Sequence, residues 1–185
     1  MLAVNLVEDE TSLIIQTQNG DREAFSELVR RYHVKVINVV YHLCGDVNLA
    51  EDAAQIAFIR AWQHLPELQP RSTFRNWLYR IAVNAALDII RRERPTTDID
   101  DLRLVAPAEN IEAHLEQEER AQQIRQAVLA LPEASRAVLV LREYEGLSYR
   151  EIAETLDISM GTVMSRLNYA RTRLADILSQ WMEPA

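Results

Sequence analysis

The sequence predicts an all-α protein, and three observations carry that prediction. Apolar residues recur every three or four positions along several long stretches, as they do on one face of a helix. No long stretch alternates apolar and polar residues, and hairpin turns between β-branched runs are absent. Ser148 is followed three residues later by Glu151, the spacing of a capping box that opens a helix. We therefore expect two small helical domains joined by a flexible linker.

An acidic N-terminal segment, residues 1–20, precedes the first domain, which we expect over residues 21–95. Asp21 is placed to cap its first helix, and Gly45 is placed to end that helix. Pro95 follows the last helix of this domain, after a cluster of arginines. The domain is expected to contain three amphipathic stretches: Asp21 to Leu43, Leu49 to Leu65, and Thr73 to Arg94.

Between the two domains the helical pattern is lost. Residues 96–115 are acidic and are rich in threonine, aspartate and proline with isolated aliphatic side chains. Such a composition favours an extended connector over a packed element. The next helical stretch, Ile111 to Leu131, begins within this connector and continues into the second domain.

The second domain is expected over residues 116–185. Pro132 is a favourable residue at the start of a helix, and the helix that follows is expected to run from Glu133 to Tyr144. Gly146 should stop it. A helix-turn-helix and a tail to Trp181 complete the domain.

The helix-turn-helix begins at the capping box of Ser148. Asp157 and Ile158 form its corner, and Ser159 can cap the second helix. In that helix Val163, Leu167 and Ala170 recur at helical spacing and should lie inward. The opposite face carries groups suited to phosphates and base edges: Thr162, Ser165, Arg166, Asn168, Tyr169, Arg171 and Arg173. The alternative is an ordinary helical hairpin with a solvated face, but this stretch contains arginines and no acid.

The net charge of −8 indicates weak binding to DNA alone, because non-specific affinity depends on neutralising phosphates. The basic residues are nearly all arginine, with Lys35 the one lysine. Arginine presents a planar fork that matches phosphate and guanine edges. We therefore expect a protein partner to supply further contacts.

Other functional classes find little support in the sequence. The one cysteine, Cys44, excludes an internal disulfide framework and a multi-cysteine zinc site. The four histidines lie far apart, and no glycine-rich phosphate loop or nucleophile motif appears, so we expect neither an enzyme nor a cofactor. The N-terminus lacks an export signal and no apolar run is long enough to span a membrane. We expect a cytoplasmic protein without membrane insertion.

An ordered set of motifs resembles the extracytoplasmic-function (ECF) sigma factors of the sigma-70 family, the two-domain initiation subunits of bacterial RNA polymerase. The similarity runs from about Leu13 to Leu178. Its marks are Asn19-Gly-Asp21, Ala24-Phe25, Asp52-Ala-Ala-Gln55, Phe58-Ile-Arg-Ala-Trp62, Trp77-Leu-Tyr-Arg-Ile-Ala-Val-Asn84, Leu131-Pro-Glu133, Leu141-Arg-Glu143, Gly146-Leu-Ser-Tyr-Arg-Glu-Ile-Ala153, Gly161-Thr-Val163 and Ser165-Arg-Leu167.

The resemblance implies that core RNA polymerase is a partner, through its β′ clamp helices and its β flap. The stretch that matches the clamp-binding helix supplies the implied polymerase-binding residues: Asp52, Gln55, Ile56, Phe58 and Arg60. A purely structural alternative exists for the aromatic side chains, since Phe58 and Trp62 can instead fill the core of the first domain.

Promoter DNA is the second implied partner. The loop from Leu65 to Phe74 matches the part that captures an unpaired base of the minus-ten element, with Trp77, Arg80 and Asn84 behind it. Positive groups are needed for the displaced strand, and Arg75, Arg80, Arg91 and Arg92 can follow its phosphates. Alternatively, Trp77 and Ile81 are core residues at helical spacing.

The helix from Ser159 to Leu174 matches the element that reads the minus-thirty-five box in the major groove. The family also implies an anti-sigma partner that covers the polymerase-binding surfaces. The rival hypothesis is a helix-turn-helix regulator that binds an operator without core polymerase. That class usually joins the motif to a domain of alternating strands and helices, whereas residues 21–95 predict helices only.

Overall fold

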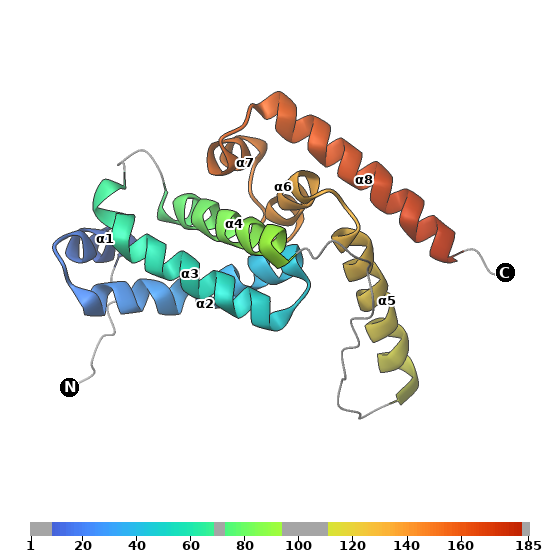
Figure 1. Ribbon diagram of the computed structural model, residues 1–185, viewed down its shortest axis with the longest axis horizontal. Coiled ribbons are helices and arrows are strands. Elements are labelled where there is room, and N and C mark those ends of the chain that lie inside the picture. The colour runs from blue at the N-terminus through green and yellow to red at the C-terminus, as the bar shows by residue number, and fades with distance from the viewer. Residues whose placement is uncertain (1–8, 69–72, 94–110, 183–185) are drawn as a thin grey trace.

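The computed structural model describes residues 9–68, 73–93 and 111–182, and within these ranges all regular structure is helical (Figure 1). The all-α prediction is thereby confirmed. The elements are α1 (Glu10–Gln18), α2 (Arg22–Cys44), α3 (Val47–His64), the short 3-10 helix η1 (Leu65–Glu67), α4 (Phe74–Glu93), α5 (Ile111–Leu129), α6 (Glu133–Glu143), α7 (Tyr149–Leu156) and α8 (Met160–Met182).

The predicted signals at helix ends act as expected in the N-terminal half. The Asp21 carboxylate accepts hydrogen bonds from the backbone amides of Glu23 at 2.8 Å and Ala24 at 3.2 Å, which caps α2. Gly45 ends α2 with a φ of 78°, a left-handed conformation that favours glycine. The Asp46 carboxylate then accepts from the amide of Leu49 at 2.9 Å and caps α3.

Helices α2, α3 and α4 form the core of this half. The buried face of α3 consists largely of small side chains, which let neighbouring helices approach closely: Ala50, Ala53, Ala54, Ala57 and Ala61. Larger side chains of α2 and α4 fill the space around them, with Leu28, Val36, Phe74 and Leu78 fully or almost fully buried.

Helix α1 was not predicted, since residues 1–20 were assigned only to an acidic segment. Leu13 is completely buried in the common core, and the Tyr32 hydroxyl of α2 donates a hydrogen bond to the carboxylate of Glu10. The Gln18 amide donates to the carbonyl of Leu65 at 3.1 Å, which ties the end of α1 to η1. These tertiary contacts stabilise a nine-residue helix, which is too short to be stable through its local helix propensity alone.

The helix-turn-helix has the predicted caps. The Ser148 hydroxyl accepts from the Glu151 amide at 3.2 Å, and the Glu151 carboxylate accepts from the Ser148 amide at 2.8 Å, which completes the capping box of α7. Asp157 ends α7 with a φ of 55°. Ser159 then caps α8, because its hydroxyl accepts from the amide of Thr162 at 3.0 Å.

One helix runs well beyond its predicted bounds. Helix α8 runs without a break to Met182, well past the predicted end at Leu174, because Leu174 and Ile177 continue its inward face toward α5. Helix α5 starts at Ile111, as predicted, so residues 111–115 of the predicted connector are helical. Most of that connector lies outside the described residues, and the domain boundaries remain predictions.

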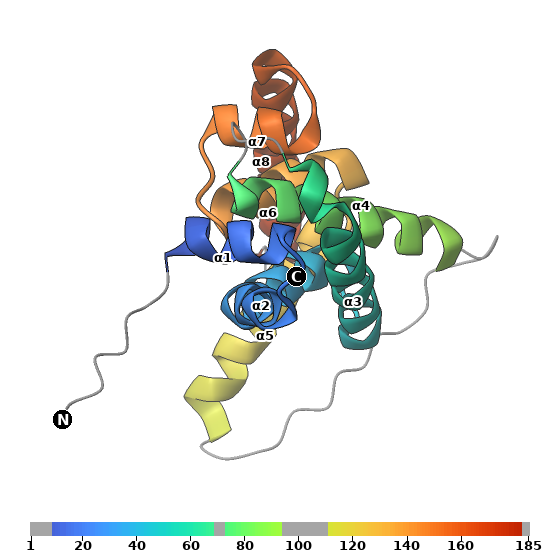
Figure 2. The ribbon, with the colours of Figure 1, turned by 90° about the vertical axis from the view of Figure 1, so that its left-hand side faces the viewer.

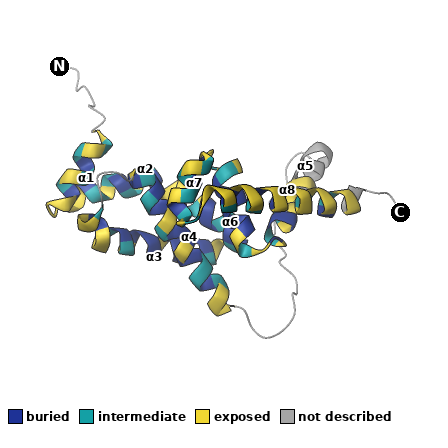
Figure 3. Ribbon diagram, turned by 90° about the horizontal axis from the view of Figure 1, so that it is seen from above, coloured by how far each residue is buried: buried dark blue, intermediate teal, exposed yellow. Residues whose placement is uncertain are grey.

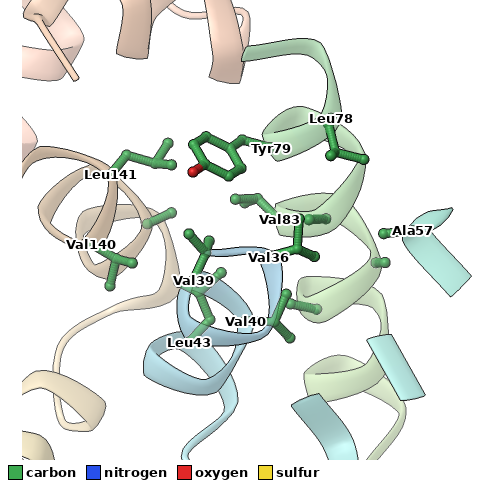
Figure 4. Close-up of a cluster of buried hydrophobic side chains, with 14 of the residues drawn as sticks. Val36, Val39, Val40, Leu43, Ala57, Leu78, Tyr79, Val83, Val140 and Leu141 are labelled. Carbon is green, nitrogen blue, oxygen red and sulfur yellow. The ribbon is translucent and has the colours of Figure 1, made fainter. Parts of the chain in front are cut away.

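The two halves share one hydrophobic core. Helix α6 lies against α2, and α7 lies against α4 (Figures 1 and 2). Figure 4 shows Val39 and Leu43 of α2 facing Val140 and Leu141 of α6, with the ring of Tyr79 from α4 beside Leu141. The Arg136 guanidinium of α6 donates to the carbonyls of Leu43 in α2 and Leu131. Seen from above, the outer side of α8 is exposed while the helices beneath it carry the buried residues (Figure 3).

Candidate nucleic-acid and protein interfaces

Helix α8 has the two predicted faces, one directed inward and one directed outward. Val163, Leu167 and Ala170 are at most 1% exposed, as predicted. Most of the predicted DNA-binding residues are exposed, namely Ser165, Asn168, Tyr169, Arg171 and Arg173, while Thr162 and Arg166 are half-buried. The predicted set therefore lies on one side of α8 and leaves polar and cationic groups available to a ligand.

Two contacts orient side chains on this face. The Ser165 hydroxyl donates to the carbonyl of Thr162 at 3.0 Å. The Arg171 guanidinium donates to the Glu143 carboxylate at 2.7 Å and so links α8 to the end of α6. The same carboxylate raises the pKa of Arg171 above its ordinary value.

On α4, three predicted DNA-binding residues meet at one pocket of about 310 Å³. Trp77, Arg80 and Asn84 line it together with Ile81, and α3 and η1 supply Arg60, His64 and Glu67. Asn84 is exposed and Trp77 is half-buried. Arg60 was predicted to bind polymerase, yet it faces this pocket and pairs with Asp88 at 3.5 Å.

The other arginines of α4 lie elsewhere. Arg75 is not among the pocket residues and pairs with Glu151 of α7 at 2.5 Å. Arg91 lies 3.6 Å from the carboxylate of Glu133 at the start of α6. Arg92 lines a separate pocket of about 240 Å³ with Asp52, Gln55 and Ile56 of α3. The predicted DNA-binding residues of α4 are thus divided among four places.

A larger groove of about 610 Å³ lies between α2 and α3. Phe58 belongs to its lining and is only 8% exposed, so its ring is mainly a core element, stacked on His33 at a centroid distance of 6.2 Å. Asp52 and Gln55 are exposed at the groove, and Ile56 is half-buried nearby. Trp62 packs its ring 5.1 Å from that of Phe25.

The residues of α2 that line this groove were not predicted from the sequence. Phe25, Val29, His33 and Ile37 follow one another at intervals of four residues and line it together. That spacing is a second stripe on α2, beside the stripe of Leu28, Tyr32 and Val36 that enters the core. A search for two separate apolar stripes on one helix would have found it.

Acids of the C-terminal half face the basic residues of α4. The Arg75–Glu151 pair is accompanied by Arg80, whose guanidinium lies 3.2 Å from the carboxylate of Asp157. The Tyr79 hydroxyl donates to the Glu145 carboxylate, and burial together with that carboxylate raises the pKa of Tyr79. Hydrogen bonds from the backbone and hydroxyl of Ser148, with the charge of Arg75, lower the pKa of Glu151.

Comparison with known families accounts for both halves of the molecule. Residues 28–96 match the family described as Sigma-70 region 2, and residues 121–174 match Sigma-70, region 4. Together the two matches cover most of the chain. The chain belongs to the ECF sigma factors of the sigma-70 family. It is a transcription initiation factor of bacterial RNA polymerase, and an operator-binding regulator is not favoured.

Curated relatives match this sigma factor over nearly its whole length. It is 34% identical to the RNA polymerase sigma-H factor of Pseudomonas aeruginosa, with 96% of this chain and 98% of the relative covered. It is 36% identical to the ECF sigma factor SigW of Bacillus subtilis, covering 87% and 92% of the two chains. It is 39% identical to the ECF sigma-E factor of Escherichia coli, covering 86% and 88%.

Solved structures share its fold. CnrH, solved in complex with the cytosolic domain of CnrY, superimposes with a TM-score of 0.69 at 28% identity and covers 92% of this sigma factor and 97% of CnrH. The sigma factor RpoE of Bartonella quintana, solved with the anti-sigma factor NepR, gives a TM-score of 0.67 at 22% identity, with 84% and 96% covered. The second likeness concerns the fold alone.

Within residues 9–68, 73–93 and 111–182, no group of three or more His, Cys, Asp or Glu side chains is placed to hold a metal ion. Among the helices described, none combines the length and the apolar character that a membrane span requires.

Proposed function

We propose that this sigma factor uses three surfaces during initiation: the exposed face of α8 for the minus-thirty-five element, the basic residues of α4 for the minus-ten element, and α3 for core polymerase. The observation that carries the proposal is the two-sided character of α8. On its apolar side Val163, Leu167 and Ala170 are at most 1% exposed, and its other side carries exposed arginine, amide and hydroxyl groups.

For the minus-thirty-five element, α8 is the recognition helix of the helix-turn-helix and enters the major groove. Asn168 has an amide that matches an adenine edge, and Arg171 and Arg173 have guanidinium forks for phosphate or guanine. Arg166 is half-buried, so its guanidinium suits a phosphate at the groove wall. Thr162, Ser165 and Tyr169 supply hydroxyl contacts.

For the minus-ten element, the pocket on α4 receives an unpaired base. A volume of about 310 Å³ bordered by an aromatic ring, an amide and two guanidinium groups suits a stacked and hydrogen-bonded base. Trp77 supplies the stacking surface and Asn84 the amide. Arg75, Arg80, Arg91 and Arg92 bind phosphates of the strand on either side.

For core polymerase, the exposed residues Asp52 and Gln55 of α3 contact the β′ clamp helices, with Ile56 adding an apolar contact. Phe58 contributes to core binding as part of the lining of the groove between α2 and α3. Arg60 contributes where α3 borders the base pocket. The helix-turn-helix domain contacts the β flap. Catalysis belongs to the polymerase, so this chain needs no cofactor of its own.

A regulatory partner is also proposed. CnrH, which is similar over most of its length, was solved with the cytosolic domain of another protein, CnrY. We extend that arrangement to this sigma factor as binding of an anti-sigma factor in the cytoplasm. The partner would cover the polymerase-binding surfaces and so prevent holoenzyme formation.

In vitro transcription with purified core polymerase and a library of promoter fragments tests the proposed function. Template-dependent initiation is expected only when this protein is added, and the protein should co-elute with core polymerase. The surface assignments fail if Asp52→Ala and Gln55→Ala together leave core binding unchanged. The operator hypothesis predicts instead that the protein alone retards a specific duplex and leaves initiation by core unaffected.

A further inference from the structure

Two methionines interrupt the polar face of the recognition helix. Met160 and Met164 lie on the first turns of α8 and are 47% and 48% exposed. They are four residues apart, so their side chains are neighbours on one side of the helix. Neither belongs to the predicted DNA-binding residues. Single exposed apolar side chains are common on protein surfaces, whereas two neighbours within a proposed binding face indicate an apolar contact there.

The groups around the methionines match a nucleic acid. Arginines follow them along α8, and no acid occurs between Ser159 and Leu174, so this stretch is complementary in charge to DNA. Asn168 follows Met164 by four residues, which places an amide beside the thioether. Figure 3 shows the outer side of α8 exposed. An apolar pair, an amide and several guanidinium groups are therefore presented together.

Met164 lies in the part of a recognition helix that approaches base edges. Helices of this motif place their N-terminal residues against the bases of the major groove. Side chains on a helix lean toward its N-terminus, so that of Met164 extends over the first turn of α8. The exposed ring of Tyr169 is five residues further on, about 140° around the helix axis at 3.6 residues per turn. The two methionines are thus a separate apolar strip.

A methionine side chain suits one feature of the major groove. Its sulfur is a weak acceptor and the rest of the side chain is apolar, so it cannot match the donors and acceptors of base edges. The C5-methyl group of thymine is the apolar group that base pairs present in this groove. Contact between the two removes apolar surface from water. The amide of Asn168 matches an adenine edge, so the asparagine and Met164 together favour A·T pairs.

We propose that Met164 is a specificity-determining residue of this sigma factor, whose side chain contacts the 5-methyl group of a thymine in the minus-thirty-five element. This role rests on the proposed function in one respect, the entry of α8 into the major groove at that element. Replacement of thymine by deoxyuridine removes the methyl group and keeps every hydrogen-bonding group of the base pair. The contact can therefore be measured separately from the rest of the interface.

Deoxyuridine substitution tests the contact in the holoenzyme. A promoter fragment selected with core polymerase is synthesised with each thymine of its minus-thirty-five element, on either strand, replaced in turn by deoxyuridine. Competition against the fluorescein-labelled parent fragment gives the Kd of the holoenzyme for each. Met164→Ala removes the thioether. The matched control is Val34→Ala, which shortens an exposed apolar side chain on α2, away from the proposed DNA-binding surfaces.

In the wild type, at least one deoxyuridine substitution should raise the Kd about fourfold, the value of one buried methyl group. The same substitution should leave the Kd of Met164→Ala unchanged and should raise that of Val34→Ala about fourfold. A residue that only stabilises α8 would affect thymine and deoxyuridine fragments alike, so the ratio of the two Kd values reports the contact itself. Circular dichroism of each variant verifies that the fold is intact.

Two results would overturn the role of Met164: no thymine whose methyl group matters to the wild type, or a methyl effect of equal size in Met164→Ala. Exchange of the same A·T pairs for G·C separates these results from a failure of the proposed function. Weaker binding on exchange without a methyl effect retains the minus-thirty-five assignment and removes only the role of Met164.

A different result would remove the proposed function alone. If the protein does not act with core polymerase but retards a duplex by itself, the proposed function is lost. The ratio of the two Kd values is then measured on that duplex, and a ratio that depends on Met164 retains the methyl contact. A protein that binds DNA in neither assay loses both.

Discussion

The Arg171 guanidinium of α8 donates a 2.7 Å hydrogen bond to the carboxylate of Glu143, the last residue of α6. Both side chains are about half exposed, at 51% and 47%. An ion pair with that exposure contributes roughly 0–1 kcal/mol to stability. Its larger effect is on orientation, because it fixes where one of the proposed promoter-binding groups lies on the recognition helix.

Arg171→Ala should reduce use of a cognate promoter by the holoenzyme about tenfold, the effect of losing one good DNA contact. Core binding should be unchanged, since the proposed clamp-binding residues lie on α3 and Arg171 lies on α8. Glu143→Gln is the matched control, because it removes the same ion pair and leaves the arginine. Promoter titration and a core pull-down measure the two effects. Equal losses in both assays would mean that Arg171 is structural.

Ser148→Ala should lower the free energy of unfolding by about 1 kcal/mol, because it removes the hydroxyl that caps α7. Urea unfolding followed by circular dichroism measures the change. Ser179→Ala, in the exposed part of α8, is the control and should change stability by a few tenths of a kcal/mol at most. A loss from Ser179→Ala as large as that from Ser148→Ala would show that the cap has no special role.

The helix-turn-helix was predictable in detail because its signals are local. The capping box joins residues three positions apart, and the inward spacing of Val163, Leu167 and Ala170 is a property of one helix. The base pocket was partly predictable for the same reason, since Trp77, Arg80 and Asn84 share one side of α4. The resemblance to a known family indicated which residues form the pocket, and helical periodicity explains why they lie together on α4.

The rest depends on contacts between distant parts of the chain, which helical spacing does not encode. Arg75 and Glu151 are 76 residues apart, and nothing in either local sequence indicates their pairing. Arg60 was assigned to a polymerase surface from its motif, whereas the crossing of α3 and α4 brings it to Asp88. Helix α1 forms because its side chains reach α2 and η1, an effect that composition alone did not reveal.

Gly45→Ala should destabilise the protein more than Gly20→Ala. Both glycines have positive φ, 78° and 93°, so both substitutions impose a comparable backbone cost of about 1 kcal/mol. At Gly45 an added Cβ would also lie 2.5 Å from Cδ1 of Leu129 in α5, whereas at Gly20 nothing lies within 4 Å. Thermal unfolding of the two variants gives the difference. Equal shifts in Tm would show that α5 yields to the added methyl group at no cost.

Below about neutral pH, His42 should make the sigma factor less stable. Its ring packs against that of Tyr144 at a centroid distance of 3.7 Å, where burial, and then the nearby charge of Arg125, lower the pKa of His42 below its ordinary 6.5. As the pH falls below 6.5, the unfolded chain therefore binds the proton before the folded protein does. The free energy of unfolding decreases over the same range, until the pH has passed the lower pKa of the folded state.

His42→Phe keeps an aromatic ring against Tyr144 and removes the titration, so it isolates this contribution. The free energy of unfolding should fall less steeply between about pH 7 and pH 5 in the variant than in the wild type. The remaining histidines and the carboxylates are common to both proteins and cancel in the comparison. If the free energy of unfolding fell with pH equally in both proteins over that interval, protonation of His42 would cost no stability. The contact between α2 and Tyr144 would then open to admit the proton, and burial of the ring would not disfavour the charge.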